Sequence, residues 1–508
     1  MRQYKITVLR LICLRRLKFR KNVGFRIILC CASLFTHSNK SNDMLRKLFY
    51  FTLYLCILCF SKTLFAQTLS DKVDSYVQKA MVERHIPGLS LAVVFDGVPV
   101  KVKGYGLSNI ENNITVNPET VFQSGSIGKQ FTATAIMQLK EEGKLKLDDK
   151  ISKFLTATPA TWQNITIRHL LTHTSGIPDY PDDTLVVNLQ KNYTEDQLLK
   201  MAMSLPLAFQ PGEKWTYSNP GYVLLGILIH QITGKFYGEV MQEKIFTPLS
   251  METIRIINEP DIIMNRSSGY ELKNGEWKNQ SWVSPTLNTT ADGSLYLTVL
   301  DLIKWDAAIT KEKILNHEDL QLMVSPMKLN NDSLHPYGFG WFLNSLNGHK
   351  AFQHGGGWQG YNTYIARFPD DKLSVIVLTN LSPANPGLIA NDIAALYIPE
   401  LRRPKFNVIK DDNAAMANLI AELFRNPLAT DFNNELFSKD AVSKIKALTV
   451  SNNSLLKTFG QVQNVIRLEN IGNSNQSKYL IKYKVGARVA LVTKNNLGQI
   501  ISIVSEAE

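Results

Sequence analysis

The sequence predicts an α+β protein: an antiparallel sheet flanked by helices, a helical subdomain beside it, and a small α+β domain at the C-terminal end. Two observations support this fold class. Strand-like segments occur at both ends of residues 67–402, with helix-like segments between them, so both ends of this region should contribute to one sheet. After Pro399–Pro404 the pattern changes to short helices followed by four strand-like segments, which indicates a separate domain at 403–508.

Residues 1–66 have the composition of a leader. They contain 13 of the 56 Lys and Arg residues, all five cysteines and only one of the 44 acidic residues. The rest of the chain therefore carries 43 residues of each charge sign. This neutral body argues against nucleic acid as a partner, and its lack of cysteine argues against disulfides and thiol chemistry there.

The apolar run Leu48–Phe60 is typical of a signal peptide, because it is preceded by two basic residues and is shorter than a usual membrane span. We expect residues 1–43 to be an upstream extension or a misassigned start. Residues 44–66 are then the signal peptide, and the mature chain begins near Gln67. The expected location is periplasmic or secreted, and an uncleaved segment that anchors the protein in the membrane is the alternative.

The body begins with a predicted β-hairpin, Leu89–Val94 and Val98–Tyr105 around the turn Asp96-Gly97. A second predicted hairpin, Asn362–Arg367 and Leu373–Leu378, lies near its end. Between the hairpins the sequence predicts helices at 127–142, 195–204, 220–233 and 299–309. In the C-terminal domain it predicts helices near 412–425 and 434–447, and strands near 462–469, 477–483, 487–493 and 499–504.

Ser126 and Lys129 lie at the start of the first predicted helix. Its apolar stripe consists of Ile127, Phe131, Ala135 and Leu139. Residues three apart on a helix have Cβ atoms about 5–6 Å apart, so the lysine faces the serine. A partly buried lysine loses its proton more readily than a solvated one. The pair indicates an activated serine nucleophile, although Ser-x-x-Lys alone also occurs by chance.

Two further motifs accompany this pair. Tyr217-Ser218-Asn219 lies in a turn before the predicted helix 220–233, where the phenol can pass a proton and the amide can both donate and accept. The stretch from His354 to Gly357 reads His-Gly-Gly-Gly and comes just before a predicted strand. Glycines there allow a substrate to approach the backbone N–H groups closely.

In this order, the three motifs resemble those of the serine β-lactamase and penicillin-binding protein superfamily, in particular its class C β-lactamase and related serine hydrolase branch. The connecting segments Ile165–Gly176 and Pro248–Met251 also resemble landmarks of that family. The likeness covers roughly residues 70–400. It implies the β-lactamase/transpeptidase-like fold and an acyl-enzyme mechanism that needs neither a metal nor an organic cofactor.

The resemblance also implies a role for each motif residue. Ser126 is the acylated nucleophile, Lys129 its activator and Tyr217 the proton shuttle, with either Lys129 or Tyr217 as the general base. Asn219 orients the substrate, and His354 and Gly356 supply the strand motif. The N–H groups of Ser126 and Gly357 form the oxyanion hole.

The strand motif departs from the Lys-Thr-Gly of classical β-lactamases. His354 replaces a permanent charge with a group expected to titrate near neutrality, and Gly355 removes the hydroxyl. The departure favours an esterase, amidase or D-amino-acid peptidase. We expect the protein to be a monomer that acts on small molecules or short peptides. The alternatives are a true β-lactamase or D-Ala-D-Ala carboxypeptidase, and a noncatalytic sensor of cell-wall fragments or β-lactams.

Other signals favour structural roles. His354 to Gly357 also spells an oxyanion motif of α/β-hydrolases, but the chain has no G-x-S-x-G elbow. His169 and His173 have zinc-protease spacing, yet Leu170 stands where the required glutamate would be, so we expect both to be structural. Three aromatic residues are expected to line the substrate pocket or to pack in the core, namely Tyr180, Trp358 and Tyr361.

Overall fold

The structure is a computed structural model that describes residues 68–179, 188–257, 260–273, 275–402 and several segments within 407–507. The predictions for the leader, for Tyr180 and for most of 434–447 lie outside the described residues. In the described part of the chain, no helix is both long enough and apolar enough to span a membrane.

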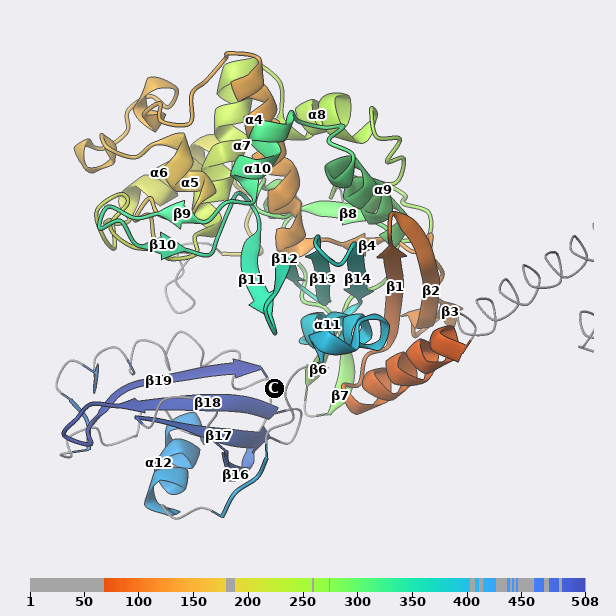
Figure 1. The fold of residues 1–508 in the computed structure, drawn as a ribbon. Helices are drawn as coiled ribbons and strands as arrows, with labels where there is room; N and C mark the ends of the chain where they lie inside the picture. The colour runs from red at the N-terminus through yellow and green to blue at the C-terminus, as the bar shows by residue number, and fades with distance from the viewer. Residues whose placement is uncertain are drawn as a thin grey trace, which may run out of the picture. The chain divides into compact units, whose positions relative to one another are not determined.

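The body is built on a seven-stranded antiparallel sheet with the strand order β11-β12-β13-β14-β1-β2-β3 (Figure 1). The strands are β1 (Gly88–Phe95), β2 (Val98–Asn109), β3 (Ile114–Thr115), β11 (Phe342–Leu346), β12 (His349–Trp358), β13 (Tyr361–Phe368) and β14 (Leu373–Thr379). β1 pairs with both β2 and β14, with Leu91 opposite Val377. Both predicted hairpins are confirmed, and segments nearly 300 residues apart in sequence meet at the centre of the sheet.

Helices cover both faces of this sheet, and β1 alternates its side chains between two apolar cores. Leu89, Leu91 and Val93 pack on the face covered by α11 (Pro386–Tyr397) and by the helix over residues 68–83. Ala92 points to the other core, which the sheet shares with the helical subdomain. Seven of the eight residues of β1 are buried, as expected for a strand covered on both sides.

The four helices predicted between the two hairpins are confirmed as α4 (Lys129–Glu141), α6 (Glu195–Ser204), α7 (Asn219–Thr233) and α9 (Val299–Thr310). Three shorter helices that were not predicted accompany them: α5 (Ile167–Leu171), α8 (Tyr237–Met241) and α10 (His317–Met323). Local signals set the ends of α7: the Ser218 side chain accepts from the Gly221 N–H at its start, and Gly234 adopts a left-handed conformation at its end.

Shorter elements connect these parts. The remaining strands described in the body are β4 (Phe122–Gln123), β5 (Arg255–Ile256), β6 (Tyr270–Lys273), β7 (Glu276–Asn279), β8 (Leu295–Leu297), β9 (Met327–Lys328), β10 (Leu334–His335) and β15 (Leu381–Ser382). Short 3₁₀ or π turns lie at Gly125–Gly128, Ile151–Lys153, Ala160–Trp162, Gln242–Phe246, Leu287–Thr289 and Pro399–Leu401.

The C-terminal segments form a second sheet with its own core. β16 (Val462–Leu468), β17 (Gln476–Tyr483), β18 (Ala487–Lys494) and β19 (Ile500–Ala507) pair in sequence order, all antiparallel. The apolar face of α12 (Ala414–Arg425) joins side chains of this sheet in one buried cluster. The predicted α+β character of this region is confirmed.

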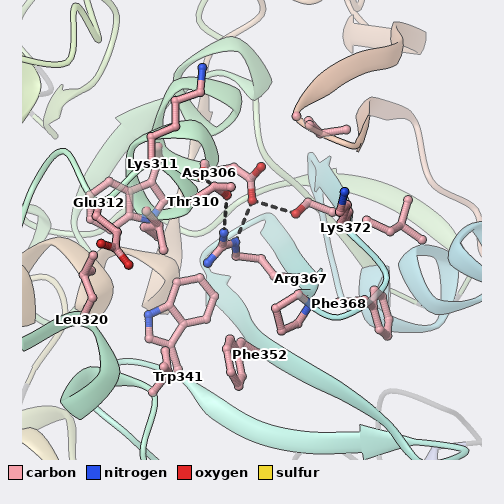
Figure 2. Close-up of a pocket in the computed structure, with 18 of the residues that line it drawn as sticks. Asp306, Thr310, Lys311, Glu312, Leu320, Trp341, Phe352, Arg367, Phe368 and Lys372 are labelled. Carbon is pink, nitrogen blue, oxygen red and sulfur yellow. Dashed lines mark hydrogen bonds and ion pairs between the residues drawn. The ribbon is translucent and has the colours of Figure 1, made fainter. Parts of the chain in front are cut away.

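A cavity of about 450 Å³ lies among α9, α10 and the β13–β14 hairpin (Figure 2). At its wall, Arg367 Nε donates to Asp306 Oδ1 at 2.7 Å and Arg367 Nη2 donates to Thr310 Oγ1 at 2.7 Å. Ser374 also donates to Asp306. Because both charged side chains are buried, this ion pair ties α9 to the sheet. None of the three motif segments of the predicted catalytic site lines the cavity.

Candidate active site

Ser126 lies in the 3₁₀ turn Gly125–Gly128, which leads directly into α4. The regular helix therefore begins two residues later than the predicted 127–142. The cause is the tight packing of this turn: Gly125 has φ +52°, and a Cβ there would lie 2.5 Å from the Gly357 nitrogen. A Cβ on Gly293 would lie 2.5 Å from the Gly125 oxygen. Glycines thus allow the turn Gly125–Gly128, here called the serine turn, to pack closely against β12 on one side and against the loop before β8 on the other.

Lys129 is fully buried and points at Ser126. Its Nζ lies 2.9 Å from Ser126 Oγ, 2.7 Å from Asn219 Oδ1 and 2.6 Å from the Asp292 carbonyl oxygen. Burial lowers its pKa to about 8, against the opposing effect of the Asp292 and Asp179 carboxylates. A substantial fraction of this amine is therefore neutral near physiological pH.

The two other partners of Lys129 direct its lone pair. The Asp292 carbonyl can only accept a hydrogen bond. The Asn219 amide is oriented by Asp179, whose two carboxylate oxygens accept from Asn219 N at 3.0 Å and Nδ2 at 3.2 Å, so that Oδ1 faces Lys129. A neutral amine has two N–H donors, which these two acceptors occupy. The lone pair is then left for the Ser126 hydroxyl, as a general base requires.

Tyr217 lies beside this pair on the segment that precedes α7. Its phenol interacts with the Ser126 side chain, and its ring centroid is 4.9 Å from Lys129 Nζ. Burial raises the pKa of Tyr217 well above its ordinary value. The free protein thus carries a phenol rather than a phenolate at neutral pH, which makes Tyr217 suited to donate a proton.

His354 is held in a different state from the one expected. It is 2% exposed, its Nε2 lies 3.2 Å from Tyr337 Oη, and its Nδ1 lies 2.7 Å from the Gly355 oxygen. Burial and the nearby Lys129 charge lower its pKa to about 3. The expectation that His354 titrates near neutrality is wrong, because tertiary packing removes the imidazole from water.

The glycines of β12 approach the serine turn closely. A Cβ on Gly356 would lie 1.9 Å from the Ser124 oxygen, whereas Gly357 is exposed and has more space. β11 pairs with β12 only as far as Gln353. The stretch from His354 to Trp358 therefore pairs with β13 on one edge but not with β11 on the other. This leaves backbone groups beside Ser126 that an extended substrate could pair with.

The structure thus brings Ser126, Lys129, Tyr217 and Asn219 into contact, with Gly356 and Gly357 packed against the same turn. His354 is connected to this group through Tyr337. Sequence reasoning missed Asp179, Asp292 and the Tyr337 link. No local pattern could have found them, because each acts on a residue far away in the chain; Asp179 and Asn219, for example, are 40 positions apart.

The aromatic residues suggested for the pocket differ in environment. Tyr361 is 2% exposed and donates to the Ser267 oxygen at 2.6 Å, so it belongs to the core. Trp358 is partly exposed at the end of β12. Within the described residues, no cluster of three His, Cys, Asp or Glu side chains is arranged to hold a metal ion.

Comparison with known proteins shows which family the chain belongs to. The family model described as Beta-lactamase matches residues 73–398. The chain belongs to the Beta-lactamase family. Relatives of the chain include proteins named penicillin-binding proteins, and the family predicted from the three motifs is confirmed.

Two relatives illustrate the extent of the similarity. Penicillin-binding protein 4* of Bacillus subtilis (strain 168) is 32% identical over 291 residues, which are 54% of this chain and 64% of that protein. Protein flp of Staphylococcus aureus (strain MW2) is 29% identical over 324 residues, 61% of this chain and 63% of that protein. The chain thus aligns with slightly less than two thirds of the length of these relatives.

Solved structures of the family share the fold. The octameric penicillin-binding protein homologue from Pyrococcus abyssi matches with a TM-score of 0.57 and 26% identity, covering 86% of this chain and 96% of that one. The penicillin-binding protein from Bacillus halodurans matches with a TM-score of 0.56 and 28% identity, covering 63% and 98%. The predicted fold class is confirmed by these matches.

Proposed function

We propose that this β-lactamase-family protein is an exported, monomeric hydrolase that forms an acyl-enzyme on Ser126 and cleaves amide or ester bonds. The substrates are D-amino-acid peptides, amides or esters. The observation that carries the proposal is the environment of Lys129: a buried amine of lowered pKa, 2.9 Å from Ser126 Oγ, with two other acceptors that direct its lone pair to the hydroxyl.

Acylation begins from neutral Lys129. As Ser126 Oγ bonds to the substrate carbonyl carbon, its proton passes to Lys129 Nζ, and the negative charge on the carbonyl oxygen is stabilised by the N–H groups of Ser126 and Gly357. Tyr217 then donates its phenolic proton to the leaving nitrogen or oxygen, and the Lys129 ammonium restores that proton. The leaving amine or alcohol departs and Ser126 remains esterified.

Deacylation repeats these steps with water as the nucleophile. Lys129, neutral again, receives the proton of the attacking water directly or through Tyr217. The tetrahedral intermediate collapses, and Ser126 Oγ leaves with the proton that the Lys129 ammonium returns to it. The free acid is released, and the site returns to its starting protonation state.

The state of His354 favours the amides and esters within this substrate class. Classical family members present a lysine of the strand motif to a substrate carboxylate, as the sequence comparison implied. Here the equivalent position carries a buried, neutral imidazole, and Lys129 is engaged with Ser126. A site without that second positive charge favours substrates that do not present a carboxylate at this point.

The test uses the purified full chain with three substrate classes: p-nitrophenyl esters, D-amino-acid p-nitroanilides and a chromogenic cephalosporin. We expect turnover of the first two and an acyl adduct in the intact mass. Ser126→Ala should lose both, whereas the exposed-serine control Ser345→Ala should keep them. Full turnover by Ser126→Ala would refute the mechanism.

The same panel separates the alternatives. Preferential turnover of the cephalosporin would identify a true β-lactamase, a possibility raised by relatives that are named penicillin-binding proteins. Fast formation of an adduct without turnover would indicate a sensor. Amino-terminal sequencing of protein recovered outside the cytoplasm tests export, with a start near Gln67 as the expected result.

A further inference from the structure

A chain of buried hydrogen bonds joins two of the three motif segments. The Ser218 N–H donates to His173 Nδ1 at 3.1 Å, and His173 Nε2 lies 3.1 Å from Tyr337 Oη. Tyr337 Oη lies 3.2 Å from His354 Nε2, and His354 Nδ1 lies 2.7 Å from the Gly355 oxygen. The three side chains, His173, Tyr337 and His354, are each at most 2% exposed. We call this chain the His173–Tyr337–His354 relay.

The chemistry of the two ends fixes the tautomer of each histidine. A backbone N–H can only donate, so His173 Nδ1 is an acceptor and the single hydrogen of the neutral ring is on Nε2, where it donates to Tyr337. A carbonyl oxygen can only accept, so the hydrogen of His354 is on Nδ1 and its Nε2 is an acceptor that faces the Tyr337 hydroxyl. The two histidines are therefore held in opposite tautomers.

The arrangement favours uncharged rings. A protonated His173 would present a hydrogen to the Ser218 N–H, which itself can only donate. The charged group that faces the relay is Lys129, which adds to the effect of burial in lowering the pKa of both imidazoles. The Tyr217 and Tyr222 rings pack on the His173 ring, and the Tyr222 hydroxyl, which donates to the Leu171 oxygen, also hydrogen-bonds Tyr337.

Both ends of the relay adjoin groups that act in the proposed reaction. Ser218 stands between Tyr217 and Asn219, and Gly355 stands between His354 and Gly356. The His173 ring also packs on the Tyr217 ring, with centroids 4.2 Å apart. His173 itself has φ +58°, a strained conformation for a non-glycine residue that persists only where the surroundings enforce it.

We propose that His173 and Tyr337 are positioning residues. They hold Tyr217 at a fixed distance from β12, the strand that supplies the Gly357 N–H of the oxyanion hole. His354 serves as the last link of this relay rather than as a substrate-binding cation. The kinetic part of this inference rests on the proposed function, whereas the tautomers follow from the geometry alone. The two parts are therefore tested separately.

The tautomers are tested by ¹⁵N NMR of the histidine-labelled full chain, with assignments from His173→Asn and His354→Asn. We expect pyridine-like Nδ1 and pyrrole-like Nε2 for His173, the reverse for His354, and no titration of either between pH 5 and 8. The same tautomer in both rings, or a midpoint within that range, would overturn the relay even if the enzyme is active.

The positioning role is tested with Tyr337→Phe, which removes one oxygen and keeps the ring. Misplacing a reacting group by about 1 Å can cost about 10²-fold in rate, so we expect kcat for p-nitrophenyl acetate to fall by roughly 10- to 100-fold, with KM within about threefold. The control is Tyr105→Phe, a buried tyrosine that donates instead to Asp74. Its kcat should stay near that of the parent protein.

Two substitutions of His173, each of which can keep one of its two hydrogen bonds, show which bond the loss of kcat depends on. His173→Asn can keep the acceptor for the Ser218 N–H but loses the donor to Tyr337, so combining it with Tyr337→Phe should add little further loss of kcat. His173→Gln can keep the donor to Tyr337. Additive losses in the double variant, or a rise in KM alone, would refute the positioning role. Inactivity of the parent protein toward every ester and amide of the panel would instead refute the proposed function and leave the NMR result to decide the relay.

Discussion

Lys129 is the residue whose ionisation should govern the rate. Its ammonium form cannot accept the Ser126 proton, and its pKa is lowered to about 8. The active, neutral fraction therefore falls as the pH falls below 8. The pKa of His354, lowered to about 3, lies outside the range in which the rate would be measured.

We therefore expect kcat/KM to rise with pH, by about tenfold per unit well below pH 8, and to level off above it. No inflection near pH 6.5 should appear. Lys129→Arg keeps a positive charge that cannot be released, so it should lose the pH-dependent activity at every pH. The pH–rate profile of the parent protein is the measurement, and a flat profile from pH 6 to 9 would rule out Lys129 as the base.

Asp179 should affect both the orientation of the Asn219 amide and the pKa of Lys129. Its carboxylate orients Asn219 and raises the pKa of Lys129. We expect Asp179→Asn to lower kcat by roughly tenfold, and to move the rising limb of the pH profile to lower pH because the amine is then neutral at lower pH. Asp196→Asn, at an exposed aspartate paired with Lys200, serves as the control. A limb that stays in place in Asp179→Asn would contradict this account.

At the scale of elements, sequence periodicity predicted the two hairpins and the helices, because both depend on local patterns of apolar residues. It could not place the start of α4, which follows from the contact of Gly125 with Gly357 across more than 200 residues. It also assigned His354 the wrong protonation behaviour. Burial by Tyr337 and the charge of Lys129 set that state, and neither contact has a signature near residue 354.

The packing of β12 on the serine turn predicts a ranking of two glycine substitutions. In Gly356→Ala the new methyl group would meet the Ser124 backbone oxygen at 1.9 Å, so the strand or the turn must move. In Gly357→Ala the nearest atom is the Asn362 side-chain nitrogen at 3.3 Å. We expect Gly356→Ala to lose at least about 10²-fold in kcat/KM and Gly357→Ala to lose much less. Equal losses would mean that the contact with Ser124 does not set the site geometry.

The ion pair at the cavity predicts a difference in stability between buried and exposed charges. Removing one partner of a buried pair costs about 3–5 kcal/mol, whereas an exposed pair contributes at most about 1 kcal/mol. Arg367→Met should therefore lower the midpoint of urea unfolding clearly more than Lys200→Met, whose partner Asp196 is exposed. Similar midpoints in the two variants would show that Asp306 is readily rehydrated.

At the scale of the whole molecule, the buried apolar side chains of the body and those of the C-terminal segments fall into separate clusters. The two large clusters of the body draw their buried side chains from residues 73–401, and the cluster under the C-terminal sheet draws its own from residues 416–503. In the described residues no buried side chain belongs to both groups. Because each part buries its own apolar surface, neither should need the other to fold.

A fragment that ends at residue 402 should therefore fold and keep the catalytic constants of the full chain toward p-nitrophenyl esters. This fragment contains Ser126, Lys129, Tyr217 and the relay. A small ester does not need further contacts with the C-terminal domain. The matched measurement compares kcat, KM and the unfolding midpoint of the fragment with those of residues 67–508. An insoluble fragment would show that the body depends on the C-terminal domain for folding. A soluble fragment with a raised KM toward D-amino-acid peptides alone would instead assign that domain to the binding of longer substrates.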